Sequence, residues 1–277
     1  MAKSQKIKIR EFSNLYSGLI SSCFSSESLV SRNSLSPKRL VGLYFRAKKK
    51  SFEFFCFIFL AFTEPTVLCA QLLMRRGGGL SGSYQFQRLF EIREHLKKRQ
   101  FQSAIEFGSG ASTLLFKKYV NYFISIEESE SWAKNYLQAI EKLKWIPGDL
   151  LKNVQASIRI LRRQEHLDQS GELICTYEIP ADIAGQKFEI AYIDGPTSWI
   201  QSDKFSNPRV RDKHLTIPNT TILELAHKPQ LVLVDGRRAT ISYLIEKGAL
   251  QDSFIQIRGA YLNPPLVRPY HTTILIK

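Results

Sequence analysis

The stretch from residue 103 to residue 127, SAIEFGSGASTLLFKKYVNYFISIE, constrains the fold more than any other part of the chain. A short apolar run ends near Glu106, and a turn with glycines at positions 108 and 110 follows it. A helix-like run comes next, and a second apolar run ends at Glu127. This order of strand, glycine turn, helix, strand and acid is typical of a parallel sheet that binds a nucleoside-containing cofactor at the strand tips.

The spacing of these residues suits the recognition of a nucleoside. Gly108 and Gly110 let the backbone turn sharply and approach a ligand closely, where a Cβ atom would clash. The N–H groups at the start of the following helix can hold a carboxylate or a phosphate. Glu127 stands 19 positions after Gly108, and an acid about 20 residues after the first glycine accepts the ribose hydroxyls in sites of this kind.

The same turn distinguishes between two classes of cofactor. A dinucleotide site requires G-x-G-x-x-G, and Thr113 stands at the third glycine position. Glu106 would repel a pyrophosphate, but it suits a ligand that carries an ammonium group. The run from Glu106 to Ser112, EFGSGAS, resembles the E-x-G-x-G-x-G motif of the class I S-adenosylmethionine (SAM)-dependent methyltransferases, with serine in place of the last glycine.

This resemblance implies a cofactor and a set of residues that bind it. SAM would be the cofactor, with Glu106, Gly108 and Gly110 at its methionine end and Glu127 at its ribose. The residues that the resemblance implies for cofactor binding are Glu106, Gly108, Ser109, Gly110, Ser112, Thr113 and Glu127.

The rest of the C-terminal part predicts alternating strands and helices, which imply a doubly wound, mainly parallel α/β sheet. Residues 131–145 and 239–247 have helical patterns, and strands are expected at 154–161, 188–193, 230–234, 253–257 and 272–276. The last two strands have no helix between them, which favours an antiparallel C-terminal edge hairpin. The methyltransferase fold has this ending, and a dinucleotide-binding domain usually does not.

Two aspartates, Asp194 and Asp235, are expected at strand tips, where ligands of such sheets bind. In the resembled family the tip of the fourth strand lies beside the transferring methyl group. The resemblance therefore places Asp194 there, as a general base, a metal ligand or a contact to the substrate. Arg237 and His214 join Asp235 as candidate substrate-binding residues. Turn-forming aspartates and solvated basic side chains stay open as alternatives.

The remaining histidines and cysteines give no sign of a metal centre. The five histidines are scattered without the spacing of metal ligands, and the four cysteines form no C-x-x-C pair. We therefore assign no metal site to these histidines and cysteines and expect a reducing compartment.

The N-terminal part differs in charge from the rest of the chain. Residues 1–100 carry a net charge of +12, which leaves +2 for residues 101–277. We expect a basic, serine-rich and partly hydrophobic extension with a glycine linker at 1–79, and a methyltransferase-like domain at 80–277. A basic amphipathic helix is predicted over 84–99, with its apolar side facing inward through Phe86, Leu89, Phe90 and Leu96.

The extension also raises the question of membrane contact. Residues 51–74 are apolar but interrupted by Glu64 and Pro65, which disfavours a spanning helix. An anionic membrane surface contacted through residues 46–76 is the favoured membrane interpretation, and a segment packed on the domain is the alternative. We expect a cytoplasmic location, with membrane association and an organelle transit peptide left open. The basic residues are not interleaved with aromatic ones, so nucleic-acid binding is not favoured.

The resemblance implies a SAM-dependent methyltransferase, and the acceptors common in that family are small molecules and glycan precursors, so we expect a small-molecule or glycan-type acceptor. Two other functions stay open. One is an NAD(P)-dependent oxidoreductase with an atypical glycine-rich turn, and the other is a non-catalytic membrane-surface protein that keeps the fold.

Overall fold

The computed structural model describes residues 51–76, 86–195, 217–235, 238–247, 253–256 and 272–276. Its helices are a helical stretch at 51–63, α3 (Pro65–Arg76), α4 (Phe86–Arg99), α5 (Ala111–Tyr119), α6 (Glu130–Glu141), α7 (Gly148–Ser157), α8 (Ala181–Ala184), the 3-10 turn η2 (Thr221–Glu224) and α9 (Arg238–Glu246). Its strands are β1 (Ser103–Phe107), β2 (Tyr122–Glu127), β3 (Ile158–Ile160), β4 (Arg163–Leu167), β5 (Leu173–Tyr177), β6 (Ile190–Ile193), β7 (Leu231–Val234), β8 (Ser253–Gln256) and β9 (Thr272–Ile276).

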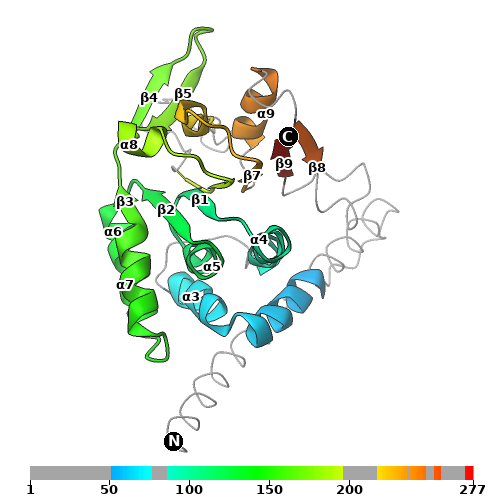
Figure 1. Ribbon diagram of the computed structural model, residues 1–277, viewed down its shortest axis with the longest axis vertical. Helices are drawn as coiled ribbons and strands as arrows, with labels where there is room; N and C mark the ends of the chain where they lie inside the picture. Colours follow the sequence, from blue (N-terminus) through cyan, green and yellow to red (C-terminus); the bar gives the residue numbers. More distant parts are fainter. Residues whose placement is uncertain are drawn as a thin grey trace, which may run out of the picture. The chain divides into compact units, whose positions relative to one another are not determined.

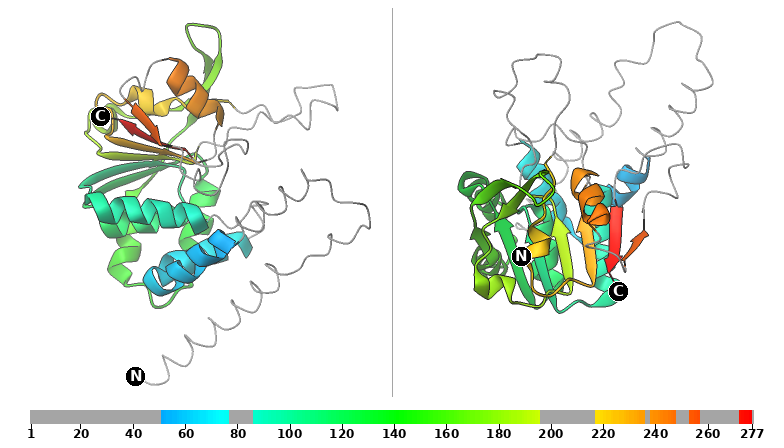
Figure 2. Two further views of the ribbon diagram at one scale, coloured as in Figure 1. Left: turned by 90° about the vertical axis from the view of Figure 1, so that its right-hand side faces the viewer. Right: turned by 90° about the horizontal axis from the view of Figure 1, so that it is seen from above.

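Seven strands form one sheet in the order β3-β2-β1-β6-β7-β9-β8. Pairing is parallel from β3 to β7, and β9 runs antiparallel to both of its neighbours. In Figures 1 and 2, α4 lies on one side of this sheet and α9 on the other. The doubly wound, mainly parallel sheet with an antiparallel edge hairpin is therefore confirmed.

The two faces of the sheet are filled differently. One face is apolar and packs against α8, η2 and α9. Its buried cluster consists of Ile105, Phe107, Ile124, Ile126, Tyr177, Ile183, Phe188, Ala191, Ile193, Ile222, Leu225, Val232, Val234 and Leu244. Because side chains alternate along a strand, Glu106 and Ser125 point to the opposite face, toward α5. A buried carboxylate thus lies in the middle of the sheet.

The structure differs from the sequence-based prediction in two places. The strand predicted at 154–161 is wrong over its first half, because α7 continues to Ser157 and only β3 is extended. Val154 is fully buried, and α7 packs on α5, so tertiary packing outweighs the alternating pattern. The antiparallel ribbon of β4 and β5 was not predicted, although the turn from Asp168 to Gly171 is a hairpin signal.

The N-terminal helices are closely associated with the sheet domain. The chain divides into two compact units between Phe52 and Glu53, so residues 53–76 belong with the remainder. Helix α3 contacts α5 and α6, with Val67, Leu68 and Ala70 buried. The predicted division of the chain at 79/80 stays a prediction, and the expected linker lies outside the described residues.

Within the part of the chain that the structure describes, no helix is both long enough and apolar enough to cross a bilayer.

A buried acid fixes these helices in place. Glu64, at the break between the helical stretch 51–63 and α3, is 2% exposed. Its carboxylate accepts hydrogen bonds from Arg93 Nε at 3.1 Å and from Lys118 Nζ at 2.7 Å, and also from the Tyr119 hydroxyl. Glu64 thus joins the N-terminal helices to α4 and α5, and it explains why an acid interrupts the apolar run.

We expect Glu64→Gln to lower the free energy of unfolding by about 2 to 4 kcal/mol, because the buried guanidinium of Arg93 loses the more deeply buried of its two charged partners. Glu94→Gln is the matched control. Glu94 also contacts Arg93, at 2.7 Å, but it is more exposed, so we expect a loss of about 1 kcal/mol or less. Urea unfolding of both variants measures the difference, and equal losses would contradict the anchoring role of Glu64.

Candidate functional site

The glycine turn after β1 has two different glycines. Gly108 has φ +99°, and a Cβ atom there would lie 2.7 Å from the backbone nitrogen of Gly195. The backbone of Gly108 therefore comes close to the turn after β6, and this contact within the protein, rather than a ligand, excludes a side chain there. Gly110 has an extended backbone, and the nearest atom to an added Cβ would be Ser112 Oγ at 4.0 Å. Of these two positions, Gly108 must be glycine because of the packing around it, whereas Gly110 has room for a Cβ atom.

Glu106 is fully buried between β1, β2 and α5. The strand register pairs it with Ser125 on one side and Tyr192 on the other. Three hydroxyl groups donate to its carboxylate: Ser112 at 2.5 Å, Thr113 at 2.6 Å and Ser125 at 2.8 Å. Ser112, which replaces the last glycine of the motif, thus links the start of α5 to Glu106 of β1 through its hydroxyl.

Burial raises the pKa of Glu106 to about 7, although the hydrogen bonds from the three hydroxyls lower it. The nearby carboxylate of Glu127 adds a smaller upward effect. A cation placed beside Glu106 would favour its ionised form and lower this pKa. The site therefore has an acid that can change its protonation state near neutral pH when a charged ligand binds.

Glu127, at the end of β2, holds the glycine turn from the other side. Its Oε2 accepts from the backbone N–H and the hydroxyl of Ser109, both at 3.0 Å, and its Oε1 accepts from the N–H groups of Glu128 and Ser129. Burial raises the pKa of Glu127, and the hydrogen bonds from Ser129 and Ser109 oppose that effect. The carbonyl of Ser109 also accepts from the indole N–H of Trp132 at 2.8 Å.

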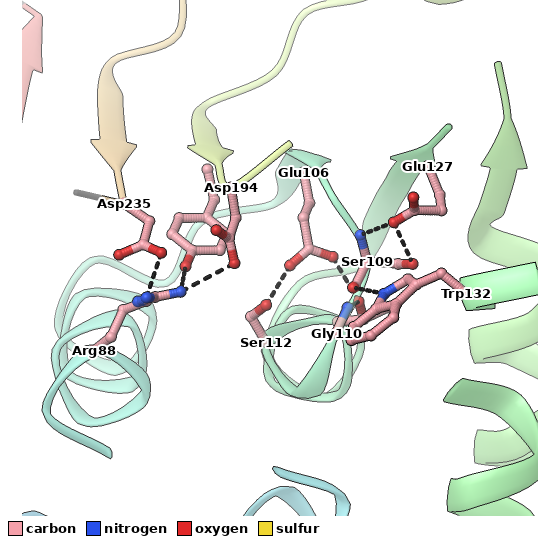
Figure 3. Close-up of polar contacts among 11 residues, drawn as sticks. Arg88, Glu106, Ser109, Gly110, Ser112, Glu127, Trp132, Asp194 and Asp235 are labelled. Atoms are coloured by element: carbon pink, nitrogen blue, oxygen red, sulfur yellow. Dashed lines mark hydrogen bonds and ion pairs between the residues drawn. The ribbon is translucent and has the colours of Figure 1, made fainter. Parts of the chain in front are cut away.

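Arg88 of α4 links the two strand-tip aspartates (Figure 3). Its Nη1 donates to Asp194 Oδ2 at 3.0 Å and to the Tyr192 hydroxyl at 2.9 Å, and its Nη2 forms an ion pair with Asp235. The Asp194 side chain is 37% exposed, whereas that of Asp235 is 9% exposed. Asp194 is therefore the more accessible of the two acids.

The charge of Arg88 is secured by its neighbours. Burial alone would lower the pKa of Arg88, but Tyr192, Asp235 and Asp194 together outweigh it and raise that pKa. The guanidinium is thus a permanent cation between the tips of β6 and β7. It neutralises the repulsion that two neighbouring carboxylates would otherwise have.

A small cavity lies between these groups and α3. Its volume is about 50 Å³, which holds only a few water molecules. It is lined by Gln71, Met74, Arg88, Leu89, Ser109, Gly110, Ala111, Ser112, Trp132, Tyr192 and Asp194. The glycine turn and the tip of β6 thus face one cavity, and α3 closes it.

Most of the residues singled out in the sequence come together here. The structure brings Glu106, Ser109, Gly110, Ser112, Thr113, Glu127, Asp194 and Asp235 to the carboxyl ends of β1, β2, β6 and β7. Arg237 and His214 lie outside the described residues. Their candidate role in substrate binding stays a prediction.

Sequence analysis missed three participants: Arg88, Trp132 and α3. Arg88 stands on a helix rich in basic residues, where an arginine with a buried partner has the same pattern as a solvated one. Trp132 falls within the helix predicted at 131–145, and that prediction does not connect it with the glycine turn. A tryptophan shortly after Glu127 was the available signal, because α6 begins beside the glycine turn.

The chain is similar to several solved methyltransferase structures at low sequence identity. No protein-family model matches the chain, and no curated protein matches it by sequence. A solved O-methyltransferase from Bacillus cereus in complex with SAH has a TM-score of 0.42 and 13% identity, covering 79% of this chain and 96% of that one. The SAH-bound methyltransferase PaMTH1 from Podospora anserina has a TM-score of 0.43 and 11% identity, covering 76% of this chain and 88% of that one.

A third solved structure is the O-methyltransferase TomG from Streptomyces achromogenes in complex with SAM, with a TM-score of 0.38 and 13% identity over 76% of this chain and 89% of that one. All three TM-scores lie below 0.5, so the fold assignment rests on the strand order and directions described above. The chain has a class I methyltransferase-like α/β fold.

The raised pKa of Glu106 has a measurable consequence. Because the folded protein holds this proton more tightly than the unfolded chain, the contribution of Glu106 to stability is present below about pH 4.5 and is lost as the pH rises toward 7. Relative to Glu106→Gln, which does not titrate, we expect the wild-type free energy of unfolding to fall by roughly 2 to 3 kcal/mol between about pH 5 and about pH 8.

Chemical denaturation at both pH values measures this difference. Glu130→Gln, at the exposed start of α6, controls for the loss of one carboxylate. A difference between wild type and Glu106→Gln that stays constant with pH would show that Glu106 is not the titrating group.

Proposed function

We propose that this chain is a SAM-dependent methyltransferase. The observation that carries the proposal is the pair of buried acids, Glu106 and Glu127, on either side of the glycine turn. The turn follows β1, whose two neighbours in the sheet are β2 and β6. The strand order reverses at this place, and open α/β sheets bind their ligands at such a point.

The chemistry of these residues suits the parts of SAM. Glu106 is the candidate partner of the ammonium group, since a cation would stabilise its ionised form. Glu127 is the candidate acceptor for the ribose hydroxyls. The backbone N–H groups at the start of α5 are suited to the carboxylate of the methionine part. When bound, SAM would supply an activated methyl group on its sulfonium.

Asp194 is the residue that we propose to take a proton from the acceptor. Its carboxylate is partly exposed beside the cavity, and Arg88 holds one of its oxygens at 3.0 Å. A hydroxyl acceptor must lose its proton during transfer, and a positioned carboxylate can accept it. A small molecule with a hydroxyl group would suit this step, and a glycan-type acceptor has the same hydroxyl chemistry.

Asp235, Arg237 and His214 remain candidates for contacts to the acceptor. Asp235 is held by Arg88, so its first role is to orient that guanidinium.

Binding of SAM requires the site to open. A cavity of about 50 Å³ is far too small for a nucleoside with an amino-acid side chain. Gln71 and Met74 of α3 line it, and Trp132 borders the turn. We therefore propose that the end of α3 moves away from the glycine turn when the cofactor enters.

The oxidoreductase alternative is less well supported by the same residues. Thr113, at the position of the third glycine, accepts a hydrogen bond from the Gly110 N–H at 3.0 Å and donates to Glu106. This threonine stabilises the first turn of α5, and the buried acid behind it disfavours a pyrophosphate. The non-catalytic alternative gives the partly exposed carboxylate of Asp194 no chemical role.

Calorimetry on the full chain tests the proposal. We expect SAM to bind with a micromolar dissociation constant and NAD not to bind. Gly110→Val should weaken SAM binding by at least about tenfold, because its side chain would enter the cavity although the fold has room for a Cβ atom there. Gly148→Val is the matched control, since a Cβ atom there has no neighbour within 4 Å among the described residues.

Binding of NAD in place of SAM would refute the proposal, and binding of neither would favour the non-catalytic alternative.

Replacement of Ser109 and of Glu127 by alanine should affect SAM affinity differently. The Ser109 hydroxyl occupies the Glu127 oxygen that a ribose hydroxyl would need. Ser109→Ala should therefore leave SAM binding unchanged or tighten it up to about fivefold, the worth of one hydrogen bond. Glu127→Ala should weaken it by about 1 to 3 kcal/mol. Calorimetry of both variants tests the assignment, and unchanged binding by Glu127→Ala would remove that acid from the cofactor site.

A further inference from the structure

An exposed apolar stripe runs along the helical stretch 51–63. Phe54, Ile58 and Phe62 are spaced four residues apart, so they lie on one face of the helix. Their exposed fractions are 40%, 36% and 83%. Three large apolar side chains in a row on a surface helix are unusual for a face that meets only water.

The opposite face of the same helix is packed on α4. The rings of Phe57 and Phe86 have their centroids 5.2 Å apart, and those of Phe59 and Phe90 are 5.0 Å apart. Cys56 and Leu60 are fully buried. The helix is therefore fixed to the domain on one side, and the stripe is what it offers to another surface.

The charge around the stripe indicates which surface it fits. In the sequence, Arg46 and Lys48 to Lys50 come just before this helix, in the part that the structure does not describe, and Arg75 and Arg76 end α3. From residue 54 to residue 62 there is no charged residue. An apolar face with basic residues on either side matches an anionic lipid surface, where both kinds of contact are available at one boundary.

A second copy of the chain fits less well. A symmetric dimer places the same patch of both copies face to face. Residues 1–100 carry a net charge of +12 in each copy, so two copies that associate through this part of the chain would repel each other.

We propose that residues 54–62 dock on an anionic membrane surface. Phe54, Ile58 and Phe62 enter the boundary between headgroups and acyl chains, and the positive charge that the sequence carries before and after this stretch attracts the anionic headgroups. The helix lies along the surface, since its other face is held by α4. This docking is independent of the proposed cofactor, and it brings the membrane to the helix whose Arg88 contacts Asp194 and Asp235.

Co-sedimentation of the full chain with lipid vesicles tests the proposal. We expect binding to phosphatidylcholine vesicles that contain about 30% phosphatidylserine, and much weaker binding to phosphatidylcholine alone. The triple variant F54Q/I58Q/F62Q should lose at least about tenfold in partition coefficient, since it removes the buried apolar area. The matched control I160Q/L167Q/L173Q changes three exposed apolar residues elsewhere and should bind as wild type does.

Two further variants separate the contributions and guard against misfolding. K48Q/K49Q/K50Q should lose about fivefold per lysine on anionic vesicles, with little change on neutral ones. F62Q alone changes the most exposed member of the stripe, and its unfolding midpoint should match that of wild type.

Failure of the wild-type chain to bind anionic vesicles would overturn the proposal. An equal loss in the stripe and control triples would do the same. If the stripe variant changed the oligomeric state in sedimentation velocity while vesicle binding stayed intact, the stripe would be an interface between copies and the proposal would be wrong.

Discussion

The arrangement of the site depends on the ion pairs that the guanidinium of Arg88 makes with Asp194 and Asp235. This guanidinium lies between Asp194 and Asp235, which follow neighbouring parallel strands, and it comes from a helix that precedes the whole sheet in sequence. Without this cation the two carboxylates would face each other at the strand tips. The same helix α4 holds the helical stretch 51–63 through its phenylalanines. Sheet, site and N-terminal helices are thus connected through one element.

The closed site provides internal hydrogen-bond partners for its two buried glutamates. Glu106 and Glu127 are buried. Hydroxyl groups of Ser112 and Thr113 donate to Glu106, and the N–H and hydroxyl of Ser109 donate to Glu127. Most of these donors are hydroxyls, which a ligand hydroxyl or ammonium group can replace without leaving a carboxylate unpaired. An exchange of one donor for another costs less than the exposure of a buried charge. The site can therefore be stable when closed and still accept a cofactor.

The parallel core of the fold could be predicted because each strand is a short apolar run that ends in a turn signal, as at Asp194 and Asp235. The glycine turn and its two acids could also be predicted, because Glu106, the glycines and Glu127 lie close together in the sequence. Arg88 could not be found, because its partners lie more than 100 positions away and a buried arginine has no signature of its own. The prediction of a strand over the first half of 154–161 was wrong, because these residues form the end of α7 and pack on α5.

A crystal structure of the full chain grown with S-adenosylhomocysteine would test the central claim most directly. The account predicts the ligand beside the turn from Gly108 to Thr113, with its ribose hydroxyls on Glu127 and its ammonium group on Glu106. It also predicts that Gln71 and Met74 have moved away from that turn. A ligand bound elsewhere, or a glycine turn that stays closed at saturating ligand, would contradict the account.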